Sequence, residues 1–111
     1  MVRVGSVVIN ASDIRRAAEF WSKALGYVPS NGRDAILVPE SGEGPILLLD
    51  EDDRMHLDLW AANEEEQQTE VERLVSLGAR RVDWVYPEGA DFVVLADTEG
   101  NLFCVVDAGR G

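Results

Sequence analysis

The side chains best suited to chemistry lie between positions 56 and 60. The run His56–Ala61 alternates in character, so in a strand His56, Asp58 and Trp60 would share one face. A histidine exchanges protons near neutral pH and can serve as a general acid or base. The chain holds one His and one Cys, so a Cys–His pair must join His56 to Cys104. That cysteine would need a neighbouring base or cation to become a nucleophile.

Each of these side chains also has a purely structural interpretation. His56 can line a pocket while hydrogen-bonded to a neighbour. Cys104 can be a small buried hydrophobe, as an unpaired cysteine usually is, or it can line a cavity without reacting. Trp60 and Trp84 can line a small-molecule site, where their faces would suit a cationic, partly aromatic ligand. They can equally pack in the core or at a dimer contact, and the sequence leaves these alternatives open.

Composition excludes several classes of partner. The formal net charge of −11 argues against nucleic acid, whose phosphates require basic surface. No apolar run approaches the roughly 20 residues of a membrane span, so no membrane association is expected. A single Cys forms no internal disulfide and predicts a reducing, cytoplasmic environment. The sequence also contains no CxxC motif and no Gly-rich phosphate loop.

The elements that must position these side chains fall into two similar halves. In the first half, Val2–Asn10 is β-branched and predicts a strand. Ser12 or Asp13 can cap a helix that begins at Ile14 and ends before Gly26. Short strands are then expected at Tyr27–Pro29, Ala35–Val38 and Pro45–Leu49.

The second half repeats this order. His56–Ala61 predicts a strand, and Asn63 with Glu66 resembles the capping box of a helix that ends at Gly78. Strands are expected at Arg81–Tyr86, Asp91–Ala96 and Leu102–Val106, followed by a loose tail at Ala108–Gly111.

Local matches support an internal repeat. Ala24-Leu25-Gly26 matches Ser76-Leu77-Gly78, and Asp13 matches Asn63. Runs of strands around one helix per half favour an α+β fold over a parallel α/β sheet. We therefore predict one domain over residues 1–111, with half-modules at about 1–50 and 55–107. Each is a βαβββ module with one helix, and the two form a cupped, mostly antiparallel sheet.

Three motifs resemble the vicinal oxygen chelate superfamily, which includes glyoxalases, bleomycin-resistance proteins and extradiol dioxygenases. They are the Asp-x-x-Gly-Asn turn at 97–101, the helix segment Ala-Ala-Glu-Phe-Trp-x-x-Ala-Leu-Gly-Tyr at 17–27, and His56 at the start of the fifth strand. The resemblance covers nearly the whole chain and implies the paired βαβββ arrangement. It is less informative about activity, because this fold hosts unrelated functions.

The resemblance also implies where a metal would bind. Metal-dependent members take ligands from the first, fifth and last strands, places held here by Ser6, His56 and Cys104, with Cys104 standing where a Glu is usual. The fourth strand, Ile46–Leu49, offers only apolar side chains. A zinc ion could be held by His56 and Cys104 only if an acid such as Asp58 joined them. We expect Asp58 to be stretched away, since two residues along a strand span about 7 Å.

The expected function is small-molecule binding in the cup of the sheet, without the usual metal triad. The residues expected to line this site are His56, Asp58, Trp60, Trp84, Cys104 and Ser6. No cofactor is expected, and a divalent metal at His56 and Cys104 is the alternative. The alternative function is a metal-dependent or His-assisted lyase, isomerase or dioxygenase of the same superfamily. The resemblance further implies a homodimer.

Overall fold

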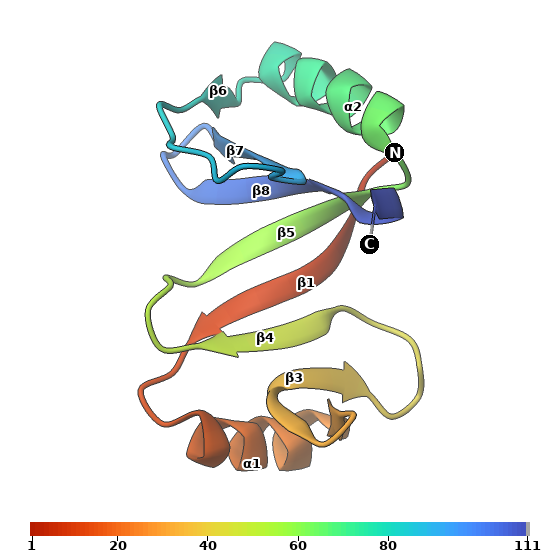
Figure 1. Cartoon of the computed structure of the whole chain (residues 1–111), viewed down its shortest axis with the longest axis vertical. Helices are drawn as coiled ribbons and strands as arrows, with labels where there is room; N and C mark the ends of the chain where they lie inside the picture. Colours follow the sequence, from red (N-terminus) through yellow and green to blue (C-terminus); the bar gives the residue numbers. More distant parts are fainter. Residues whose placement is uncertain (111) are drawn as a thin grey trace. The chain divides into compact units, whose positions relative to one another are not determined.

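The computed structural model describes residues 1–110 and forms two compact units (Figure 1). One unit contains Gly5–Met55, and the other contains the chain from His56 onward together with Met1–Val4. The elements of the first half are β1 (Arg3–Asn10), α1 (Ile14–Leu25), β2 (Tyr27–Ser30), β3 (Arg33–Pro39) and β4 (Ile46–Asp50). Those of the second half are β5 (His56–Ala61), α2 (Glu64–Ser76), β6 (Arg80–Arg81), β7 (Phe92–Ala96), β8 (Leu102–Asp107) and a 3-10 turn, Ala108–Arg110.

Strand order and direction are the same in both halves. The order β2-β3-β4-β1 in one is matched by β6-β7-β8-β5 in the other. In each, the first strand pairs in parallel with the last, and the remaining pairs are antiparallel. The α+β class and the repeated βαβββ order are therefore confirmed, with antiparallel pairing predominant within each module.

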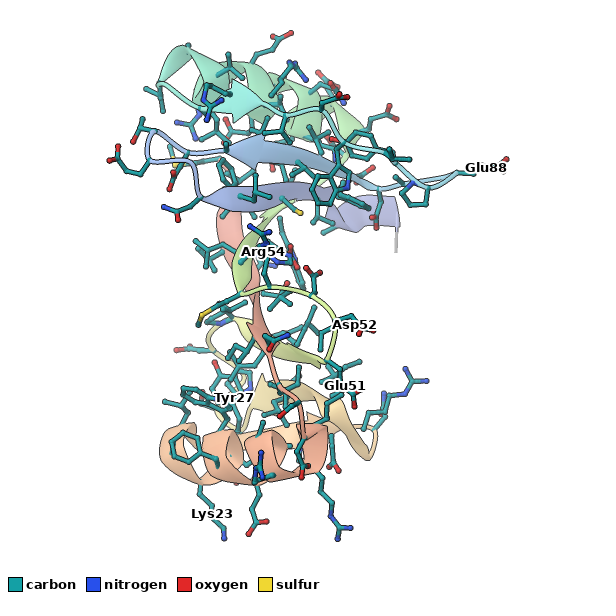
Figure 2. The ribbon with its side chains drawn as sticks, turned by 90° about the vertical axis from the view of Figure 1, so that its left-hand side faces the viewer. Lys23, Tyr27, Glu51, Asp52, Arg54 and Glu88 are labelled. Atoms are coloured by element: carbon teal, nitrogen blue, oxygen red, sulfur yellow. The ribbon has the colours of Figure 1, made fainter. Side chains whose placement is uncertain are left out.

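The unit 5–55 has its core between α1 and one face of its strands. The Asp13 side chain caps α1 by accepting the Arg16 N–H at 3.0 Å, and Gly26 ends the helix in a left-handed conformation at φ 73°. Figure 2 shows Lys23 extending outward from α1. The buried residues of this core are Ala11, Ala18, Leu37, Leu47 and Leu49.

The other unit has its core beneath α2. Asn63 caps α2 by accepting the Glu66 N–H at 2.8 Å, as the sequence predicts. Val71 of the helix, Leu95 of β7 and Val105 of β8 are each 0% exposed and pack together. Gln67 donates to the carbonyl oxygen of Val105 at 2.9 Å, which fastens the helix to the sheet.

The prediction of a strand at Arg81–Tyr86 is wrong for most of these residues, because β6 contains only Arg80 and Arg81. In the register of β6 with β7, Val82 would pair next with Val94. The N–H of Val94 instead donates to the hydroxyl of Tyr86 at 2.8 Å. The segment that follows β6 therefore leaves the sheet as a loop, and Figure 2 shows Glu88 projecting from its tip.

Among the described residues, neither helix is both long and apolar enough to span a membrane.

Candidate functional site

Three of the residues singled out by the sequence lie on one face of β5 and β8. Val105 packs against Val71 of α2, so its neighbour Cys104 faces away from that helix. Asp58 is the register partner of Cys104 in the parallel pair of β5 with β8. His56 shares the face of Asp58 by alternation along β5. Pairing and alternation thus bring the imidazole, carboxylate and thiol together on the face opposite α2.

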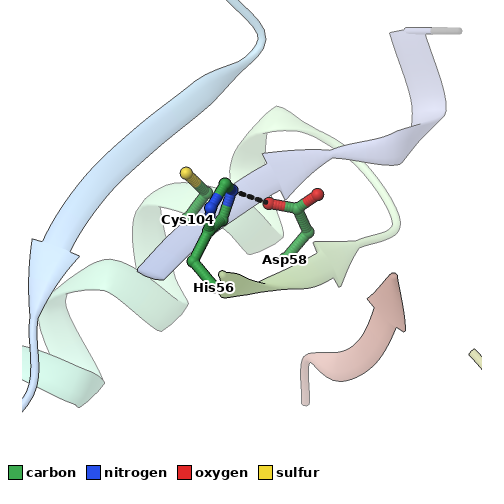
Figure 3. Close-up of side chains that lie close together, drawn as sticks. All are labelled: His56, Asp58 and Cys104. Atoms are coloured by element: carbon green, nitrogen blue, oxygen red, sulfur yellow. Dashed lines mark ion pairs between the residues drawn. The ribbon is translucent and has the colours of Figure 1, made fainter. Parts of the chain in front are cut away.

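The three side chains converge closely (Figure 3). His56 Nε2 lies 3.3 Å from Asp58 Oδ1, and their side chains are 11% and 14% exposed. One ligand atom from each of His56, Asp58 and Cys104 lies within 4.8 Å of the other two. We call these residues the His-Asp-Cys cluster. The expectation that Asp58 would be stretched away is wrong, because strand rise separates the backbones of His56 and Asp58 while their side chains lean together.

Trp60 lies on the same face of β5 as His56 and Asp58, and the guanidinium of Arg3 lies over its ring. The guanidinium carbon of Arg3 lies 5.2 Å from the centroid of the Trp60 ring. Arg3 makes no ion pair with any residue in the described part of the chain. The sequence did not predict this contact, because no local pattern relates the first strand to Trp60. Arg3 thus places a positive charge near the face of β5 that carries the Asp58 carboxylate.

Apolar side chains border the cluster on the β7 side. Val94, 3% exposed, is the register partner of Cys104, and Phe92 is the partner of Val106. The ring of Tyr86 lies 5.5 Å from that of Phe92. The cluster is therefore a small polar group at the edge of an apolar surface, the composition typical of small-molecule sites.

The two remaining predicted site residues lie outside the cluster. Ser6 is 1% exposed and belongs to the unit 5–55, where it is the register partner of Ile46. Trp84 is 45% exposed on the loop after β6. Their participation in a site stays a prediction.

The donor set of the cluster fits a divalent metal by type and by spacing. Imidazole nitrogen, carboxylate oxygen and thiolate sulfur are the three kinds of protein ligand that zinc takes. Bond lengths of about 2.0–2.3 Å in a tetrahedron place such ligand atoms about 3.3–3.6 Å apart. The separation of 3.3 Å between His56 Nε2 and Asp58 Oδ1 already matches this spacing.

Comparison with known protein families identifies the fold. The model of the glyoxalase-like domain matches residues 6–106. The chain belongs to the glyoxalase-like domain family. The predicted membership of the vicinal oxygen chelate superfamily is thereby confirmed. Among curated proteins, none matches the chain.

Solved structures share the glyoxalase-like fold at low sequence identity. One is described as an NAD-dependent benzaldehyde dehydrogenase from Legionella pneumophila, at 13% identity and a TM-score of 0.65, covering 92% of this chain and 96% of that one. Another is methylmalonyl-CoA epimerase from Mycobacterium tuberculosis, at 17% identity and a TM-score of 0.53, covering 96% and 86%. At these identities the likeness concerns the fold alone.

Proposed function

We propose that this glyoxalase-like domain binds a small molecule over the face of β5 that carries the His-Asp-Cys cluster. The observation that carries the proposal is the convergence of three polar side chains beside an apolar border. Polar side chains are ordinarily costly to withdraw from water, and His56 and Asp58 are largely buried. The pairing of His56 with Asp58 at 3.3 Å offsets part of that cost and presents a preorganised polar group that a ligand can contact.

The charge around Trp60 favours a ligand of a different kind from the cationic one that the sequence suggested. One face of the ring is already occupied by Arg3, whose guanidinium has no carboxylate partner among residues 1–110. A carboxylate can form a paired, charge-assisted hydrogen bond with such a guanidinium. We therefore infer an anionic ligand that carries a second oxygen within reach of His56.

Two aromatic probes of opposite charge test this proposal. Phenylglyoxylate carries a carboxylate and an adjacent keto oxygen, whereas benzyltrimethylammonium carries a cation on a similar ring. We expect phenylglyoxylate to bind the more tightly and to shift the Trp60 indole signal in nitrogen–proton NMR spectra. Arg3→Gln should weaken phenylglyoxylate binding by about tenfold or more, since a charge-assisted hydrogen bond contributes about 1.5–3 kcal/mol.

Arg81→Gln is the matched control for the loss of positive charge. Arg81 is exposed on β6, which β7 and β8 separate from β5 in the strand order, so its replacement should leave phenylglyoxylate binding unchanged. Tighter binding of benzyltrimethylammonium, binding of neither probe, or equal effects of the two Arg substitutions would each overturn the proposal.

Catalysis is the second candidate function, and one observation favours it. Asp58 Oδ1 lies 3.3 Å from His56 Nε2, an arrangement that can orient an imidazole as an acid or base in a lyase or isomerase. The binding proposal predicts no turnover of the methylglyoxal–glutathione adduct, because Cys104 stands where the resemblance places a Glu. Turnover that His56→Ala abolishes would instead establish the enzyme.

The homodimer and the cytoplasmic location stay predictions. Light scattering coupled to size-exclusion chromatography measures the mass in solution, and a monomer at micromolar concentration would contradict the dimer.

A further inference from the structure

We propose that the His-Asp-Cys cluster is a zinc site contained within one module, with His56, Asp58 and Cys104 as its three protein ligands. The ligand set differs from the one that the resemblance implies, because it uses Asp58 and needs neither Ser6 nor a residue of β4. The inference deepens the proposed function by naming an ion in the same site, but its measurement requires no small-molecule probe.

Geometry supports the ion directly. The ligand atoms of His56, Asp58 and Cys104 lie within 4.8 Å of one another, so the largest separation must shrink by only about 1 Å to reach tetrahedral spacing. Rotation about side-chain bonds supplies a movement of that size. Three protein ligands leave a fourth position of the tetrahedron for water or a ligand oxygen.

Charge supports it as well. A carboxylate and a thiolate would together neutralise a dipositive ion, with the imidazole bound in its neutral form. The acidic chain, at a formal −11, also attracts cations from solution.

The other module provides an internal comparison. Counted back from the helix caps Asp13 and Asn63, Ser6 corresponds to His56 and Val8 to Asp58. The register partner of Val8 on β4 is Leu48, as Cys104 is the partner of Asp58 on β8. The same fold thus accepts Val and Leu at positions equivalent to Asp58 and Cys104. The fold itself therefore gives no reason for a polar pair at these positions, which favours a role in ligation.

Cobalt titration under reducing, oxygen-free conditions tests the site, because tetrahedral Co²⁺ is coloured and reports its ligands. We expect one ion per chain, visible d–d bands, and a near-ultraviolet sulfur-to-cobalt charge-transfer band that disappears in Cys104→Ser. Zinc should compete for the same site. Asp58→Asn should weaken zinc binding by about 100-fold or more. Loss of a residue that only hydrogen-bonds to a metal ligand typically weakens metal binding by about 10- to 100-fold, so a larger effect indicates direct ligation by Asp58.

Two further variants keep the test decisive. Asp52→Asn is the charge-matched control. Asp52 is exposed in the loop after β4 (Figure 2), so its replacement should leave zinc binding unchanged. Asp58→Val with Cys104→Leu copies the equivalent pair of the other module and should give a folded protein, by circular dichroism, that binds no zinc.

Each outcome bears on one proposal separately. Absence of the sulfur-to-cobalt band, or zinc binding that Cys104→Ser and Asp58→Asn leave intact, would overturn the zinc site. Fast alkylation of Cys104 that zinc does not slow would indicate a thiol–imidazole pair in its place. Phenylglyoxylate binding is measured with and without chelator, so the binding proposal can fail while the zinc site stands, and the reverse.

Discussion

Glu70 of α2 should stabilise the unit that carries the His-Asp-Cys cluster, and its contribution should depend on pH. The side chain of Glu70 is 6% exposed. It accepts a hydrogen bond from Arg73 Nη2 at 3.1 Å and another from the Val2 N–H at 2.7 Å. The Arg73 hydrogen bond, followed by that of Val2, lowers the pKa of Glu70 from 4.5 to about 2. The same carboxylate therefore holds the backbone next to Arg3.

The magnitude follows from the lowered pKa. A fall from 4.5 to about 2 corresponds to at most about 3 kcal/mol of folding free energy. The Arg73 side chain is 38% exposed, so solvent screening reduces this value, and we expect Glu70→Gln to cost about 1–2 kcal/mol at neutral pH. Because the pKa is lowered on folding, the contribution is complete above 4.5 and is lost as pH falls toward 2.

Urea unfolding measures this contribution. Wild type and Glu70→Gln are compared from pH 7 down to the lowest pH at which both proteins still fold. The difference in unfolding free energy should shrink as the pH falls below 4.5. Glu72→Gln is the matched control, because it removes the same charge from an exposed position on the same helix, and it should change stability by less than about 0.5 kcal/mol. A difference that is independent of pH, or an equal loss in Glu72→Gln, would refute the reasoning.

Two further predictions concern the ends of elements. Asn63→Ala should lower the unfolding free energy by about 1 kcal/mol in urea, because the Glu66 N–H at the start of α2 loses its acceptor; no change would contradict the cap. Asp97→Ala should lower the melting temperature, because Asp97 Oδ1 accepts the N–H groups of Glu99 at 2.8 Å and Asn101 at 2.9 Å. The Asn101 side chain lowers the pKa of Asp97, so this deficit should narrow in acid, and exposed Asp83→Ala should show no such deficit.

Local signals account for the elements that the sequence predicted well. The bounds Ile14–Leu25 of α1 and His56–Ala61 of β5 agree with the structure, because a capping side chain, a terminal Gly or strict alternation marks them within a few residues. The early end of β6 was not predicted, because the residue pattern of Arg81–Tyr86 suits a longer strand. The competing hydrogen bond, from Val94 to Tyr86, depends on how the following loop folds back.

The sequence singled out the three residues of the His-Asp-Cys cluster but did not predict their geometry. His56, Asp58 and Cys104 were each singled out, yet their spacing depends on the register of β5 with β8, which joins segments far apart in sequence. The rise along β5 alone suggested that Asp58 lies too far away. Arg3 was missed for the same reason, since the contact with Trp60 is made only when the start of β1 lies beside β5.

These non-local contacts mean that the surroundings of the cluster, unlike its three residues, are not a product of the second repeat alone. Met1–Val4 belongs to the same compact unit as the chain from His56 onward. Glu70 fixes the Val2 backbone there, and Arg3 then covers Trp60 on the face that bears His56 and Asp58. A fragment that began at β5 would retain all three candidate ligands but would lose Arg3, whose guanidinium lies over Trp60. The proposed metal site therefore depends on the second repeat alone, whereas the proposed anion binding depends also on Arg3 of β1.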